Sequence, residues 1–212
     1  MKTDDLIRAL AADCGVRPMP PGRVLALALI PGVAITLASY FAVLGPRPHL
    51  FALLGEPRLT FKLGLTFLLV ALSPALALRL VQPGAYIRRA ALFLAIVPGL
   101  LGLASLAEIA TVPPAEWGQR LMGVNALFCL KTIPFLALAP LAAALLALRQ
   151  GACDRPALAG AGAGLFAGAI GAALYATHCP DDSPLFVAAW YSLAITFVVT
   201  LGAVAGSRLL RW

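Results

Sequence analysis

The segment Tyr175-Ala-Thr-His-Cys-Pro-Asp-Asp-Ser-Pro-Leu-Phe-Val-Ala-Ala-Trp-Tyr191 is a short polar stretch between two long apolar runs. It places His178, Cys179, Asp181 and Asp182 within five positions, in a chain in which only 12% of residues are charged. Such a stretch is typical of a tight hairpin between two membrane helices. The same residue types could also bind or react with a signal, and both interpretations remain open at this point.

The composition is that of a polytopic helical membrane protein. Of the 212 residues, 61% are hydrophobic and the mean hydropathy is +0.93, which is more apolar surface than one globular core of this size uses. Prolines and glycines are tolerated in membrane helices because neighbouring helices satisfy the freed backbone groups. We expect an all-α bundle of six spans at Val24 to Leu44, Leu59 to Val81, Ala90 to Ala110, Leu121 to Leu148, Ala157 to Thr177 and Leu185 to Gly206. Residues 1–23 form a short tail, and residues 24–212 form one membrane domain.

The basic residues set the expected orientation. The net charge is +7, but Lys and Arg stand singly at the ends of apolar runs, which argues against direct nucleic-acid binding. If the N-terminus is cytoplasmic, that side carries Lys2, Arg8, Arg17, Arg23, Arg79, Arg88, Arg89, Arg149, Arg155, Arg208 and Arg211. The remaining five are Arg47, Arg58, Lys62, Arg120 and the intramembrane Lys131. This excess predicts that both termini are cytoplasmic and that segment 175–191 faces outside.

The N-terminal tail is expected to contain a short amphipathic helix. Thr3 can cap it, and Asp4 and Asp5 suit the positive end of its dipole. Its apolar side consists of Leu6, Ile7 and Leu10. A helix of about three turns is too short to be stable alone. It therefore needs a surface to rest on, either the membrane or a groove on a partner protein.

Glycines in the last two spans predict close helix packing. Gly160, Gly164 and Gly168 recur every four residues and share one helix face, and Gly202 and Gly206 do the same in the sixth span. Because no strand precedes the glycine-rich run, a dinucleotide-binding site is not indicated.

The fourth span carries polar groups that need an explanation. Asn125, Cys129 and Thr132 share one face, and Lys131 points elsewhere. A lysine in a bilayer costs several kcal/mol unless it is paired. Either the carbonyl of Leu130, which Pro134 leaves free, or the carboxylate of Glu108 could hold its ammonium group. The lysine then acts as a tether between helices or takes part in function.

The four cysteines show no Cys-x-x-Cys spacing, so a structural zinc module is not expected. In the expected topology Cys14 and Cys153 are cytoplasmic, whereas Cys129 and Cys179 are near the outer side. Thiolates bind soft metals and react with oxidants, with imidazole and carboxylates as common co-ligands. Cys129 and Cys179, joined by His178, Asp181 and Asp182, form a candidate sensor, with Cys129, Cys179 and His178 as possible metal ligands.

Part of segment 175–191 also fits purely structural roles. Ser183 followed by Pro184 is typical of a helix start, where Asp181 and Asp182 would favour the dipole of the following helix. Trp190 and Tyr191 fit an aromatic belt at the membrane interface. These roles leave His178 and Cys179 unexplained.

Several segments together resemble the NrsF-type negative regulators of sigma F, and the resemblance covers nearly the whole chain. They are Lys2 to Ile7, the Ala/Gly-rich span ending in Leu174-Tyr-Ala-Thr-His-Cys179, Asp181 to Val187 with Trp190-Tyr191, and Arg208-Leu-Leu-Arg-Trp212. The resemblance implies a bacterial inner-membrane anti-sigma factor, not an enzyme, that holds an extracytoplasmic-function sigma factor inactive. It further implies responses to heavy-metal or oxidative stress through cysteines at 129 and 179. No obligatory cofactor is expected, only a transient heavy-metal ion as a signal.

Under this hypothesis Asp4, Asp5, Leu6, Ile7 and Leu10 bind the sigma factor. Two other classes stay open. A small transporter or transporter subunit would account for Lys131, Asn125 and the proline breaks. An intramembrane redox enzyme would use Cys129 and Cys179 as a dithiol, and the absence of Cys-x-x-Cys weighs against it.

Overall fold

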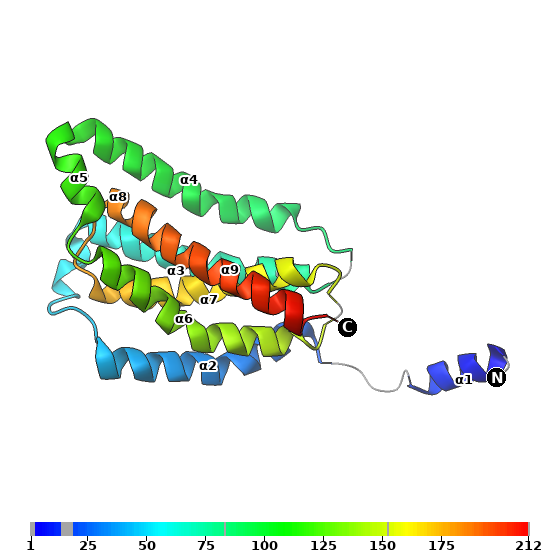
Figure 1. Ribbon diagram of the computed structural model, residues 1–212. Coiled ribbons are helices and arrows are strands. Elements are labelled where there is room, and N and C mark those ends of the chain that lie inside the picture. The colour runs from blue at the N-terminus through cyan, green and yellow to red at the C-terminus, as the bar shows by residue number, and fades with distance from the viewer. Residues whose placement is uncertain (1–2, 14–18, 83, 152, 212) are drawn as a thin grey trace.

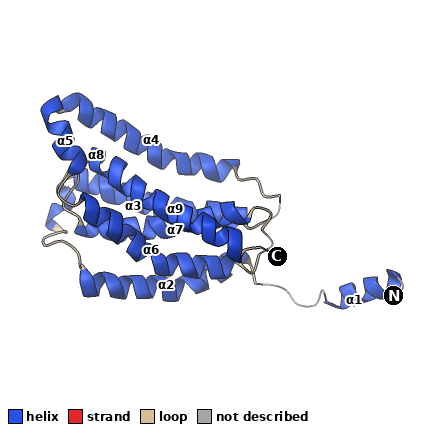
Figure 2. Ribbon diagram, in the orientation of Figure 1, coloured by secondary structure: helices blue, strands red, loops and turns tan. Residues whose placement is uncertain are grey.

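The computed structural model describes residues 3–13, 19–82, 84–151 and 153–211, and it is helical throughout (Figures 1 and 2). Six helical segments are long and apolar enough to cross a membrane, as the sequence predicts. They are α2 (Pro21–Val43), α3 (Pro57–Leu80), α4 (Arg88–Thr111), α5 with α6 (Pro114–Met122 and Ala126–Leu148), α7 (Pro156–His178), and α8, η2 and α9 in succession (Pro184–Phe186, Val187–Tyr191 and Ser192–Leu209). A 3₁₀ turn, η1 (Ala52–Gly55), precedes α3.

The fourth predicted span is interrupted. The sequence predicts one helix from Leu121 to Leu148, whereas α5 ends at Met122 and α6 begins at Ala126. Gly123 lies between them with φ +53°, a conformation that favours glycine. A Cβ at this position would lie 2.6 Å from the ring of Phe186. The close approach of α8 therefore fixes the place where the chain turns.

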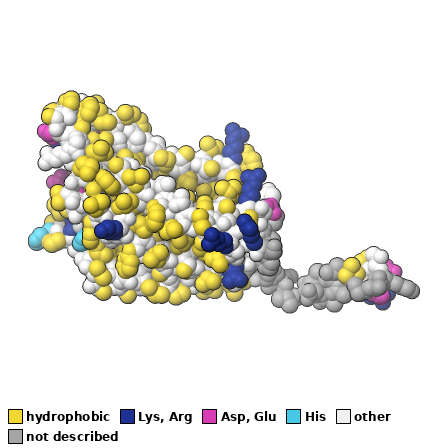
Figure 3. All heavy atoms as spheres, in the orientation of Figure 1, with side chains coloured by type: hydrophobic (Ala, Val, Ile, Leu, Met, Phe, Trp, Pro, Cys, Tyr) yellow, Lys and Arg dark blue, Asp and Glu magenta, His cyan; other side chains and the backbone are white. Residues whose placement is uncertain are grey.

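Helix α7 lies at the centre of the bundle, where it packs against α3, α6 and α9. Helix α2 packs on the outer side of α6, and α4 stands at the opposite edge against α3 (Figure 1). Hydrophobic side chains cover the body of the molecule (Figure 3). An apolar exterior of this kind matches a bilayer environment.

The predicted glycine faces of α7 and α9 meet. A Cβ on Gly160 would lie 2.2 Å from the carbonyl oxygen of Gly202, and a Cβ on Gly202 would lie 2.4 Å from the carbonyl oxygen of Gly160. A Cβ on Gly164 or on Gly206 would lie 2.6 Å from the backbone of the facing helix, while a Cβ on Gly168 would lie at ordinary contact distances. The prediction that these two helices pack closely is confirmed: α7 and α9 are in backbone contact along their glycine faces.

The N-terminal helix is also confirmed: α1 spans Thr3–Asp13. It lies beyond the bundle, at the end where the C-terminus is found (Figure 1). Leu6 and Ile7 are 44% and 57% exposed. Leu10 belongs to α1, but its side chain lies outside the described residues, as does Cys14.

Replacing Gly160 with alanine should destabilise the bundle. The added Cβ would meet backbone atoms of Gly202 and Gly206, which cannot rotate aside, so α7 and α9 must separate. Overpacking of this kind costs about 1–3 kcal/mol. We expect a lower midpoint of thermal unfolding for the purified protein in detergent. Gly102→Ala is the matched control, because nothing lies within 4 Å of its Cβ position; equal losses in both variants would contradict the packing argument.

Candidate functional site

The loop between α7 and α8 is fixed by a buried lysine. Lys62 of α3 is 1% exposed, and its ammonium donates hydrogen bonds to the carbonyl oxygens of Cys179 at 2.7 Å and Asp181 at 3.3 Å. It also forms an ion pair with Oδ1 of Asp182. Arg47 Nη1 pairs with Oδ2 of the same carboxylate at 3.0 Å. A charge this well buried requires such partners, so the loop is held onto α3.

Asp181 connects the same loop to the start of α6. Its carboxylate accepts hydrogen bonds from the backbone N–H of Val124 at 3.2 Å and of Asn125 at 3.0 Å, and from the side-chain amide of Asn125 at 3.1 Å. The first N–H groups of a helix have no partner within it, and a carboxylate is stabilising there. Asp181 thus caps α6 from a distant part of the chain.

Glu108 caps the start of the last span in the same way. This carboxylate, 3% exposed at the end of α4, accepts hydrogen bonds from the Ser183 hydroxyl at 2.7 Å and from the Leu185 N–H at 3.2 Å. Arg120 and Arg58 neutralise it at 3.1 and 3.5 Å.

Two sequence-based expectations about this helix start change accordingly. Ser183 does precede the helix, as predicted, but its hydroxyl donates to Glu108 and does not cap the helix itself. The prediction that Asp181 and Asp182 favour the dipole of the following helix is wrong. Asp181 accepts hydrogen bonds at the start of α6, and Asp182 forms an ion pair with Lys62. The carboxylate at the start of the last span is Glu108.

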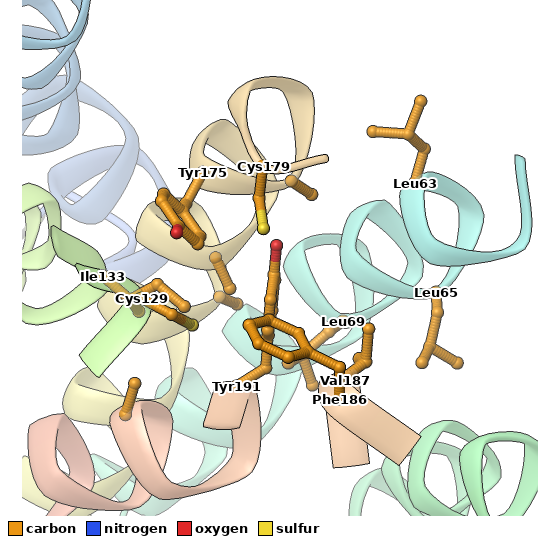
Figure 4. Packing of buried hydrophobic residues seen from close by; sticks show 14 of the residues in the cluster. Leu63, Leu65, Leu69, Cys129, Ile133, Tyr175, Cys179, Phe186, Val187 and Tyr191 are labelled. Atoms are coloured by element: carbon orange, nitrogen blue, oxygen red, sulfur yellow. The ribbon is translucent and has the colours of Figure 1, made fainter. Parts of the chain in front are cut away.

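Both predicted sensor thiols lie directly under this loop. Cys129 of α6 and Cys179 at the end of α7 are each 0% exposed and belong to one buried cluster with Tyr175 and Tyr191 (Figure 4). The Cys179 thiol faces Oδ2 of Asp181 at 4.0 Å. Burial raises the pKa of this thiol, and the nearby Lys62 ammonium opposes the rise only in part. Cys179 is therefore protonated at neutral pH.

Two buried tyrosines complete the cluster, and the sequence reasoning missed both. In Figure 4 the hydroxyl of Tyr191 points toward the sulfur of Cys179. The hydroxyls of Tyr175 and Tyr191 both lie beside the Cys179 thiol, and neither makes a hydrogen bond of good geometry among the described residues. The aromatic-belt prediction is wrong for Tyr191, which is 2% exposed. It suits only Trp190, whose indole N–H donates to the carbonyl oxygen of Leu121 at 2.9 Å. No sequence signal marks the π-helical turn η2, which orients the side chains of Trp190 and Tyr191.

His178 has a structural partner in this arrangement. Its Nδ1 donates to the carbonyl oxygen of Gly45 at 2.9 Å, and its ring packs near Phe128 and Tyr175. Within the described ranges, no three His, Cys, Asp or Glu side chains are grouped closely enough to hold a metal ion. A metal site at Cys129, Cys179 and His178 stays a prediction, and it would need His178 to leave Gly45.

The buried, paired lysine is Lys62 and not Lys131, contrary to the prediction from the sequence. Lys131 is exposed on α6, and in the described part of the chain it forms no hydrogen bond or ion pair. The expected pairing with the Leu130 carbonyl or Glu108 is wrong, since Glu108 is taken by arginines. Lys62, treated in the sequence only as an orientation charge, is the buried one. Its position inside the predicted span beginning at Leu59 was the available signal.

Replacing Lys62 with methionine should destabilise the protein strongly. The change keeps a long apolar stem but strands the carbonyls of Cys179 and Asp181 and half of the Asp182 carboxylate. Removing one partner of a buried ion pair typically costs about 3–5 kcal/mol. Thermal unfolding in detergent measures the loss, and adding Asp182→Asn should restore part of it. Arg58→Met is the control: its side chain is 50% exposed, so about 0–1 kcal/mol is expected. Equal effects at both sites would refute the central role of Lys62.

Comparisons with known proteins identify the family. Residues 10–212 match the NrsF family, described as negative regulator of sigma F. The "Anti-sigma-F factor NrsF" of Caulobacter vibrioides is 39% identical over 215 residues, with 100% of both chains covered. The "Probable anti-sigma-F factor NrsF" of Azospira oryzae is 35% identical over 215 residues, again with 100% of both covered. No solved structure matches the chain significantly. The chain therefore belongs to the NrsF family of negative regulators of sigma F, and it is a membrane regulator rather than an enzyme.

Proposed function

We propose that the protein sequesters an extracytoplasmic-function sigma factor at the bacterial inner membrane and releases it when thiol-directed stress reaches the outer cysteines. The observation that carries the first half is the full-length similarity to an anti-sigma-F factor. The transporter alternative loses its main support, because Lys131 lies on the exposed surface of α6 and Asn125 is bound to Asp181.

The proposed docking element is α1. Its apolar residues Leu6 and Ile7 are exposed, and its first turn carries Asp4 and Asp5. A short amphipathic helix with an uncovered apolar side gains stability by entering a hydrophobic groove. A groove on the sigma factor would supply this. Leu10 follows Leu6 by four residues, a spacing that predicts the same side of the helix. No direct contact of this chain with nucleic acid is part of the proposal.

The proposed orientation has both termini in the cytoplasm, where a sigma factor resides. The uneven distribution of Lys and Arg between the two sides supports it. At the opposite end, Arg47, Lys62 and Arg120 are engaged in ion pairs within the protein. Under this topology the loop with Cys179 faces outside, at the end of the bundle remote from α1.

The proposed sensor is the buried pair Cys129 and Cys179. A soft metal ion would bind both sulfurs and displace their two protons. A two-electron oxidant would instead take up two electrons and two protons as the disulfide forms. Either event draws Cys179 toward α6 and disturbs Asp181, which contacts both the Cys179 thiol and the start of α6. The helix ends that this loop holds together would then rearrange.

Aspartate substitutions on the apolar side of α1 should release the sigma factor without stress. In Leu6→Asp with Ile7→Asp, two charges would have to enter the partner's groove unpaired, which is costly. We expect co-purification of the sigma factor with the tagged protein to fall at least tenfold, and a sigma-dependent reporter to become constitutive. Arg8→Asp, on the other side of the same helix, is the control and should retain the partner. Full retention by the double variant would rule out α1 as the main anchor.

Replacing both Cys129 and Cys179 with serine should keep repression but abolish induction. The variant lacks the sulfur chemistry that a soft metal salt or a thiol oxidant needs. A sigma-dependent reporter with and without each agent measures the response, and an immunoblot of the membrane fraction checks protein level. Cys14→Ser with Cys153→Ser is the control and should respond like the parent. Normal induction in the Cys129/Cys179 variant would defeat the sensing model while leaving sigma-factor binding untouched.

A further inference from the structure

Helix α4 is held to the bundle less closely than the other spans, and an apolar cavity lies beneath it. The cavity measures about 380 Å³ and is lined by side chains of α3, α4 and α9, including Leu69, Leu94 and Ile195. On α4 its lining runs from Ala91 to Leu101, a length of about 15 Å at 1.5 Å per residue. This is an elongated apolar slot at the depth of the hydrocarbon layer.

A separate basic pocket lies near the start of α4. It measures about 350 Å³ and is lined by Arg79 of α3, Arg88 of α4 and Arg155 before α7, with Leu80 and Ile87 beside them. Arg88 stands one helical turn from Ala91, about 4.5 Å along the α4 axis. Lys and Arg side chains gather at this end of the bundle, where α4 begins (Figure 3). The polar pocket and the apolar cavity are therefore neighbours along one helix.

The charges in the pocket are only partly compensated. The Asp154 carboxylate accepts a hydrogen bond from the Gly84 N–H at 3.2 Å, and Arg79 donates to the Tyr86 carbonyl oxygen at 2.9 Å. Among the described residues, the guanidinium groups of Arg88 and Arg155 have no hydrogen-bond or ion-pair partner. Helices α4 and α7 both begin here without a side-chain cap, so their positive dipole ends add to the field. The pocket attracts an anion.

We propose that the basic pocket and the apolar cavity together bind an anionic phospholipid, with the phosphodiester of its headgroup at Arg88 and Arg155 and an acyl chain in the cavity under α4. Guanidinium groups at the ends of membrane helices are suited to anionic headgroups. An acidic protein segment would satisfy the arginines equally well. It would leave the apolar cavity next along α4 without an occupant, whereas a lipid accounts for both spaces, with its headgroup in the basic pocket and an acyl chain reaching the cavity.

The lipid would also set the position of α4. This helix carries Glu108 at its other end, where the carboxylate holds the start of the last span. An acyl chain between α4 and α3 fills space that protein side chains leave open. The bound lipid would thus support α4, whose other end contacts the loop between α7 and α8 through Glu108.

Native mass spectrometry of the full-length protein in detergent tests the proposal. The probes are phosphatidylglycerol, phosphatidylcholine with the same acyl chains, and glycerol phosphate without chains. We expect phosphatidylglycerol to bind at least tenfold more tightly than either other probe. Arg88→Gln with Arg155→Gln should weaken its binding about tenfold or more, and Ala95→Phe, which fills the cavity, should weaken it as well. Arg23→Gln with Arg208→Gln removes two exposed arginines outside the pocket and should bind like the parent.

Three results would overturn the proposal. Unchanged phosphatidylglycerol binding in Arg88→Gln with Arg155→Gln would show that the pocket does not hold the headgroup. Equal binding of glycerol phosphate would make it a small-anion site without a role for the acyl chain. If Arg88→Gln with Arg155→Gln lost sigma-factor co-purification while phosphatidylglycerol binding stayed unchanged, the pocket would be a protein-docking surface instead. Thermal unfolding in phosphatidylcholine confirms that each variant is folded before the comparison.

Discussion

The end of the bundle that carries the loop between α7 and α8 depends on one buried charge. The ammonium of Lys62 lies inside a helix bundle whose core is apolar, and it is stable there because the loop after α7 brings two carbonyl oxygens and the Asp182 carboxylate to it. Once this loop is held on α3, Asp181 reaches the start of α6 and Ser183 reaches Glu108 on α4. Four spans that are distant in sequence thus share one polar centre, and the thiols of Cys129 and Cys179 are enclosed beneath it.

The sequence predicts the helices well and their polar pairing poorly, for a physical reason. Hydropathy and helix spacing depend on neighbouring residues, so six spans, α1 and the glycine faces of α7 and α9 could be predicted. Pairing depends on which helix ends meet. The neighbouring residues Asp181 and Asp182 serve different helices, and nothing in their local sequence distinguishes them. Likewise Lys62 and Lys131 both stand in apolar runs, and only packing buries the first and exposes the second.

The same geometry decides which parts can move together. Backbone contact between Gly160 and Gly202 lets α7 and α9 pack closely along their glycine faces, so we treat these two helices as one unit. Asp181 ties the start of α6 to the loop between α7 and α8, and Glu108 ties α4 to the same end of the bundle. Both ties are charge-assisted hydrogen bonds, but α6 also packs extensively on α7, whereas α4 makes fewer contacts with the bundle. A signal at the thiols would therefore act on the ties, and α4 would be the helix most free to shift.

The free energy that a signal can supply limits how the proposed switch could work. Driving a two-state equilibrium from 1:99 to 99:1 takes about 5.5 kcal/mol of differential free energy. Disulfide formation draws its free energy from the oxidant, about 1.4 kcal/mol for every 30 mV between the potentials of the oxidant and the thiol pair, so a strong oxidant could supply enough to complete the switch. A soft metal can also supply this much, since structural zinc sites with four ligands supply about 10–16 kcal/mol. However, it must first displace protons from thiols such as Cys179, whose pKa is raised by burial, at about 1.36 kcal/mol for each pKa unit. In the proposed switch, the burial that would keep the site silent at rest would also set its threshold, because only a ligand that binds thiolate tightly would open it.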